Sequence, residues 1–131
     1  MIFYYIALFL AFGAMGWILD TGYRTIEIKK YTTGTWLPYF ALIYAVGGMI
    51  LFFIFKNTAW SIWWQIIIGW ILMILLEFFS GHLSVKILRR RFWDYRLKAR
   101  WHLAGHIDAL HSFYWLMLTI LFRMLFPYLP L

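Results

Sequence analysis

Charged residues are absent from long stretches of the chain, and this spacing is the strongest pattern in the sequence. No charge occurs at 1–19, 31–55 or 57–76, and 109–122 holds one histidine but no Lys, Arg, Asp or Glu. A helix needs roughly 20 apolar residues to cross the hydrocarbon core of a bilayer. The first three stretches meet that length directly, and the fourth meets it if Arg123 extends its guanidinium to the headgroups.

Backbone groups in lipid must be hydrogen-bonded within their own segment, so these stretches should be helices. We therefore predict an all-α, integral membrane four-helix bundle in one domain, residues 1–131. The predicted helices span about 2–20, 36–55, 59–80 and 106–126, with an interfacial segment at 82–105. The first stretch lacks a basic start and a clear cleavage site, so we expect a membrane helix there and not a signal peptide.

Small residues and prolines refine this prediction. Gly13 and Gly16 in the first helix, and Ala41 and Ala45 in the second, would let helices approach closely. Pro38 is expected in the first turn of the second helix, where its missing N–H costs nothing.

Composition supports a membrane protein. Hydrophobic residues make up 65% of the 131, aromatic residues 24% and charged residues only 13%, whereas a soluble domain carries about 25% charged residues. There is no cysteine, which excludes disulfides, thiolate zinc sites and a cysteine nucleophile. No phosphate-binding loop is present, so we expect no ATP hydrolysis by this chain and no cofactor.

The basic residues are concentrated in two of the predicted loops. The chain has twelve Lys and Arg residues and only five Asp and Glu residues. Loop 20–35 contains Arg24, Lys29 and Lys30. The cations of loop 81–105 are Lys86, Arg89, Arg90, Arg91, Arg96, Lys98 and Arg100. Because such loops stay in the cytoplasm, we predict a multi-pass protein of the cell membrane with both termini outside.

The second of these loops also has a hydrophobic period. Val85, Leu88, Phe92, Tyr95 and Ala99 follow spacings of three and four, which is one face of a helix. This pattern predicts a basic amphipathic segment in the headgroup plane, attracted to anionic lipids. The alternative is that the cations only fix topology. Because the loop is held at the membrane, we expect no nucleic-acid partner.

One acid falls inside a predicted span. Glu77 follows twenty uncharged residues, and an ionised carboxylate there is costly unless it faces the bundle and is paired. Arg24, Arg89 or Arg91 could supply the cation. The pair would be either a structural clamp or part of a membrane-embedded binding or proton-relay site.

The histidines suggest a second possibility. His102 and His106 are four residues apart, on one face if that segment is helical, and Asp108 follows closely. Two such imidazoles could bind a metal ion if Glu77 or Asp20 completed the shell. The alternative is that they cap backbone groups or contact lipid phosphate.

An ordered set of residues resembles a known family. The set comprises Gly16-Trp17, Asp20, Tyr23, Pro38-Tyr39, Tyr44, Glu77, Gly81, Trp93-Asp94-Tyr95, Gly105, Ile107, Ser112 and Trp115. It is similar to the CmpB-like family of ABC-transporter permeases over nearly the whole chain. The chain departs from that family at Asp20, where glutamate is usual, at 31–34 in place of Asn-Arg-Gly, and at His102 and His106. The resemblance implies a small multi-helix membrane protein of transport type, working with any ATPase as a separate chain.

These observations give a leading hypothesis and two alternatives. The leading one is a permease-like component with a charged ligand- or lipid-headgroup-binding site on the cytoplasmic side. Its candidate residues are Asp20, Tyr23, Glu77, Arg89, Arg91, Trp93, Asp94 and Tyr95. The expected partners are anionic lipid headgroups and either a second copy or another membrane subunit.

The first alternative is a membrane-embedded enzyme acting on a lipid or amphipathic substrate, with His102, His106 and Asp108 as candidate metal ligands. The second is a structural or assembly subunit. No residue is identified as catalytic by its pattern.

Overall fold

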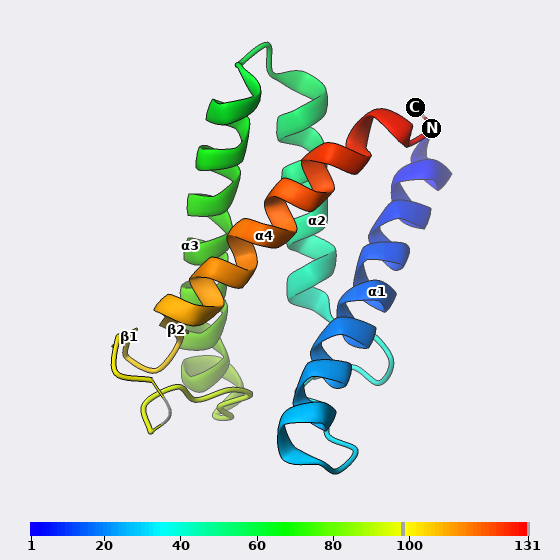
Figure 1. The fold of residues 1–131 in the computed structure, drawn as a ribbon. Coiled ribbons are helices and arrows are strands. Elements are labelled where there is room, and N and C mark those ends of the chain that lie inside the picture. Colours follow the sequence, from blue (N-terminus) through cyan, green and yellow to red (C-terminus); the bar gives the residue numbers. More distant parts are fainter. Residues whose placement is uncertain (98, 131) are drawn as a thin grey trace. The chain divides into compact units, whose positions relative to one another are not determined.

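A computed structural model describes residues 1–97 and 99–130, so Lys98, one of the cations counted above, lies outside the described residues. The elements are α1 (Ile2–Ile28), α2 (Leu42–Asn57), α3 (Ile62–Leu88), β1 (His102–Leu103), β2 (Ile107–Asp108), α4 (Ala109–Leu125) and a short 3₁₀ helix, η1 (Phe126–Tyr128) (Figure 1). The chain forms two compact units, Met1–Met49 and Ile50–Leu131.

The predicted all-α membrane class is confirmed. Among the described residues, three helical spans are long and apolar enough to cross a bilayer: Ile2–Ile28, Ile62–Leu88 and Ala109–Tyr128. The remaining helix, α2, has 16 residues and is as apolar as α3. The strands are two residues each and pair antiparallel, with His102 opposite Asp108.

Helices α1 and α3 extend about two turns beyond their predicted ends. Both have 27 residues and stop at a residue with left-handed backbone geometry, Lys29 (φ 58°) and Arg89 (φ 51°). At 1.5 Å per residue, each is about 40 Å long, against a hydrocarbon core of about 30 Å. Polar side chains mark where a helix leaves lipid, but they are compatible with helix geometry. Reading helix ends from the first charges was therefore wrong.

The second helix begins later than predicted, and Pro38 is not in its first turn. Residues 37–40 form a tight turn in which Leu37 bridges Phe40 and Tyr39 has a φ of 58°. The N–H of Ala41 donates to the carbonyl of Gly13 at 2.9 Å. Because Tyr39 has left-handed backbone geometry, a right-handed helix cannot run through it, and α2 starts only at Leu42.

Small residues hold the first unit together, as predicted. Gly13 and Gly16 are buried on α1, and a Cβ at either would collide with Phe40 or Tyr44. Ala45 is fully buried on α2. Close backbone approach supplies contact area where no hydrophobic driving force acts between helices.

In the second unit, α3 packs against α4 (Figure 1). Phe52, Met73 and Thr119 are its largest fully buried side chains. The indole Nε1 of Trp70 on α3 donates to the carbonyl of Ser112 on α4 at 2.7 Å. Toward the other end of α4, the Nε of Arg123 donates to the side-chain oxygen of Gln65 at 2.7 Å.

The helical face predicted from Val85 to Ala99 is formed only as far as Leu88. Residues 89–97 and 99–101, called here the basic segment, have no regular secondary structure, and residues 102–108 form the hairpin. The N–H of Tyr95 donates to the carbonyl of Gly105 at 3.1 Å, and the Trp93 indole donates to the carbonyl of His106 at 2.8 Å. Bonds to the hairpin thus replace the bonds of a helix in this part of the segment.

Candidate functional site

The carboxylate of Glu77 is the buried polar centre of the second unit. Its side chain projects from α3 and the residue is 5% exposed. Oε1 accepts a hydrogen bond from the Tyr95 hydroxyl at 2.9 Å, and Oε2 accepts one from the Trp115 indole at 2.5 Å. We call these three residues the Glu77 centre. The carboxylate faces protein, as expected for an acid inside a span. Its pairing with a guanidinium stays a prediction.

Trp115 reaches Glu77 because of its position on α4. Trp115 and Thr119 are the buried residues of that helix, one turn apart. Thr119 donates to the carbonyl of Trp115 at 2.7 Å, so its hydroxyl is satisfied within the helix. The buried face of α4 therefore presents the indole N–H of Trp115 to α3, and the hydroxyl of Thr119 on the same face is already hydrogen-bonded within α4.

The three residues of the Trp93-Asp94-Tyr95 sequence all form hydrogen bonds within the second unit. Trp93 bonds the hairpin, and Tyr95 bonds both the hairpin and Glu77. Asp94 accepts from the backbone N–H of Arg96 at 3.0 Å and from its guanidinium at 2.6 Å. These hydrogen bonds lower the pKa of Asp94 to about 2. Trp93 and Tyr95 thus fasten the basic segment to the hairpin and to α3 through these hydrogen bonds.

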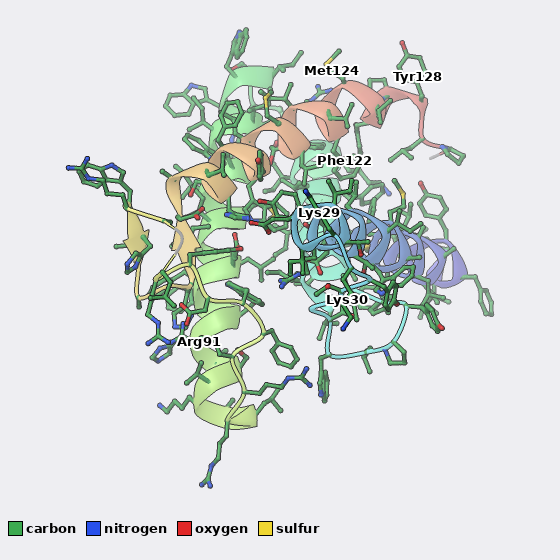
Figure 2. All side chains as sticks on the ribbon, turned by 60° about the horizontal axis from the view of Figure 1, so that its bottom comes forward. Lys29, Lys30, Arg91, Phe122, Met124 and Tyr128 are labelled. Carbon is green, nitrogen blue, oxygen red and sulfur yellow. The ribbon has the colours of Figure 1, made fainter. Side chains whose placement is uncertain are left out.

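Arg91 also contacts the hairpin. Its Nη1 donates to the carbonyl of Ala104 at 3.1 Å and lies 3.9 Å from the carboxylate of Asp94. Figure 2 shows Arg91 beside the C-terminal half of α3. Arg89, another predicted partner of Glu77, is exposed and forms the left-handed end of α3. Of the predicted site residues, Glu77 is thus joined to Tyr95, and Arg91 to Asp94.

His106 is the most buried histidine of the hairpin, at 3% exposed. It packs on Gly81 of α3, where an added Cβ would lie 2.7 Å from the imidazole Nδ1. Its ring meets Phe78 and His82 edge-on, and Nδ1 is 3.5 Å from Arg91. Burial, and then the positive charge of Arg91, lower the pKa of His106. The structure therefore favours a neutral imidazole.

Asp108 is the N-cap of α4, which begins at Ala109, three residues later than predicted. Its Oδ1 accepts from the backbone N–H of His111 at 2.6 Å and from the His111 ring at 2.7 Å. The His111 ring stacks on Tyr95 with centroids 4.1 Å apart and planes 17° apart. This N-cap therefore also supports the tyrosine that reaches Glu77.

The proposed metal ligands do not share a helical face. His102 lies in β1, and its Nδ1 accepts from the N–H of Gly105 at 3.1 Å, while His106 is buried against α3. Within residues 1–97 and 99–130, no group of three or more His, Asp or Glu is placed to hold a metal ion. The assumption that His102 and His106 lie on one helix is wrong, because residues 102–108 fold as a hairpin.

Two of the candidates belong to the first unit. The Nε–H of Arg24, one helical turn further along α1, donates to both carboxylate oxygens of Asp20, at 3.1 Å to Oδ1 and 3.0 Å to Oδ2. Tyr23 is 38% exposed on the same helix. Lys29 and Lys30 follow them in the turn at the end of α1 (Figure 2).

Sequence reasoning did not place Trp115 or His111 in the site. Both follow Asp108 on one helical stripe, at three and seven residues, inside a helix that is otherwise mostly apolar. A stripe of hydrogen-bonding side chains on a spanning helix was the available signal.

A family model described as "Putative ABC-transporter type IV" matches residues 7–129. The chain belongs to this family, and it is a membrane protein related to transport. No curated protein and no solved structure matches the chain.

Proposed function

We propose that the protein is a permease-like membrane component in which the Glu77 carboxylate receives positive charge, as a proton or as a hydrophobic organic cation. The observation that carries the proposal is the burial of Glu77 in a span, with donors brought to it from both the basic segment and α4. An acid at membrane depth is costly, and such residues typically mark ion or substrate pathways.

The chemistry around Glu77 suits a cation. The carboxylate attracts positive charge, and the Tyr95 hydroxyl and the Trp115 indole N–H donate hydrogen bonds to it. At a buried position the attraction between the carboxylate and a cation is screened less than at an exposed one. Because the two donors are neutral, they stabilise the carboxylate without cancelling its charge.

The orientation and partners are part of the same proposal. The basic segment and the end of α3 place Lys86, Arg89 and Arg90 in exposed positions, where each attracts anionic lipid by about 1 kcal/mol. By the positive-inside rule, this end is cytoplasmic and the termini are outside. Only 28% of the residues in an 18-residue apolar stretch of α3 are buried. A second copy of the chain or another membrane subunit can therefore cover the exposed faces of this helix.

The test is Glu77→Gln in the full chain in lipid nanodiscs. Glutamine keeps an oxygen that can accept from Trp115 or Tyr95 but removes the charge. Equilibrium binding of tetraphenylphosphonium tests the cation, and the carboxylic C=O band in infrared spectra across pH tests the proton. Glu27→Gln removes an acid of α1 that is exposed and serves as the control.

We expect Glu77→Gln to fold, to weaken cation binding about tenfold or more and to remove one titrating infrared band. Glu27→Gln should leave the cation binding unchanged. If Glu77→Gln matches the wild type in both measurements, the carboxylate only fastens α3 to α4, and the chain is a structural subunit.

A further inference from the structure

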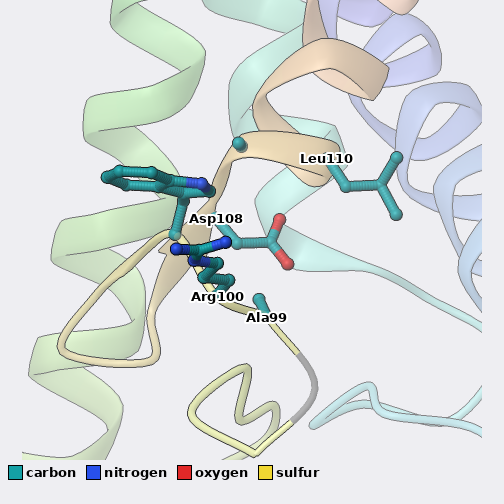
Figure 3. A pocket seen from close by; sticks show the side chains of 6 residues that line it. Ala99, Arg100, Asp108 and Leu110 are labelled. Carbon is teal, nitrogen blue, oxygen red and sulfur yellow. The ribbon is translucent and has the colours of Figure 1, made fainter.

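A pocket of about 200 Å³ lies where the basic segment meets the start of α4 (Figure 3). It is lined by Ala99, Arg100, Trp101, Asp108, Ala109 and Leu110. These six described residues are different from those of the Glu77 centre. We propose that this pocket binds the headgroup of a zwitterionic phospholipid that carries a primary ammonium group, as phosphatidylethanolamine does.

The pocket presents one fixed negative charge and one positive charge. Asp108 is 6% exposed, and the two bonds from His111 hold its carboxylate in place. Arg100 is exposed, and Figure 3 shows both side chains bordering the pocket. A simple anion would meet the carboxylate, and a simple cation would meet the guanidinium. A ligand with both signs satisfies both groups.

The surroundings place this pocket at headgroup depth. Ala109 is the first residue of α4 and of the span Ala109–Tyr128. Trp101 is 72% exposed and Leu110 is 50% exposed, and tryptophan prefers the interface between headgroups and acyl chains. The guanidinium of Arg100 lies 5.9 Å from the ring of Trp101, so the positive charge is also held at this level. A lipid can thus present its headgroup to the pocket and its chains to Leu110.

The carboxylate selects the type of amine. A primary ammonium donates charge-assisted hydrogen bonds to a carboxylate, whereas a quaternary ammonium has no N–H to donate. The phosphate of the same headgroup suits the planar donors of Arg100. The volume is below that of a typical drug-sized site, so the pocket would take a headgroup and leave the rest of the lipid outside.

Native mass spectrometry of the full chain, released from detergent micelles, tests the proposal. The probes are phosphatidylethanolamine, phosphatidylcholine and phosphatidylglycerol with identical acyl chains. Arg100→Gln removes the positive charge, and Asp108→Asn removes the negative charge while keeping a good helix cap. Lys56→Gln removes an exposed cation from the end of α2, outside the pocket, and is the matched control.

We expect the wild type to bind phosphatidylethanolamine about two- to fivefold better than phosphatidylcholine. Binding of phosphatidylglycerol measures the separate attraction of the exposed cations. Arg100→Gln and Asp108→Asn should each lose the preference for phosphatidylethanolamine, and Lys56→Gln should keep it. Circular dichroism confirms that the variants are folded. Equal or better binding of phosphatidylcholine by the wild type, or a preference that survives in both pocket variants, would overturn the proposal. Either result is independent of the Glu77 measurements.

Discussion

Replacing Tyr95 by phenylalanine removes one donor from the Glu77 carboxylate and leaves the ring that stacks on His111. The lost bond is 2.9 Å long and reaches an acceptor that is 5% exposed. Hydrogen bonds to charged groups contribute about 1.5–3 kcal/mol. We therefore expect the second unit to lose about 2 kcal/mol of stability, a change of roughly 30-fold in its folding equilibrium.

The assay is reversible unfolding in mixed micelles, with Tyr128→Phe as the control because Tyr128 is 84% exposed near the C-terminus. A double-mutant cycle with Glu77→Gln isolates the interaction, since contacting residues show coupling energies of about 0.5–3 kcal/mol. Equal stability of Tyr95→Phe and Tyr128→Phe, or a coupling energy of zero, would refute the reasoning.

Three other predictions follow from the packing, the titration and the charge distribution. Gly81→Ala should lower the free energy of unfolding by about 1–3 kcal/mol, because the added Cβ would press on His106. As the control, the Cβ added in Gly22→Ala meets nothing within 4 Å and should stabilise α1 by up to about 1 kcal/mol. Equal effects of the two substitutions would contradict this packing. Because the folded pKa of His106 lies below 6.5, its stabilising contribution should be complete above pH 6.5 and be lost as pH falls through the folded pKa; NMR titration of the imidazole checks this, and a midpoint at or above 6.5 would exclude it. A cysteine at Arg90 should resist an impermeant reagent added outside intact cells while one at Tyr128 reacts, and the reverse pattern would invert the proposed topology.

The fold class was readable from the sequence because hydrocarbon imposes a simple rule. A run of about 20 uncharged residues has few options other than a helix, and the absence of charge showed where each of the four predicted helices lies along the chain. The ends were harder to place. Asp20 and Arg24 pair within α1, one turn apart, so charges continue the helix beyond the lipid.

The site was only partly predictable for a related reason. The depth of Glu77 singled it out, since an acid at that position needs an explanation whatever the fold. Its donors depend on tertiary structure. Tyr95 reaches Glu77 because its segment is bonded to the hairpin, and no local periodicity encodes that. The apparent helical spacing of His102 and His106 was misleading for the same reason, as Gly105 has a φ of 73° and turns the chain between them.

Infrared spectroscopy of Glu77→Gln in nanodiscs, combined with tetraphenylphosphonium binding, tests the central claim most directly. The account predicts that the wild type shows a carboxylic C=O band whose intensity changes with pH or on adding the cation. That change should be absent from the folded variant. A wild-type spectrum that responds to neither pH nor the cation, with equal cation binding by both proteins, would contradict it.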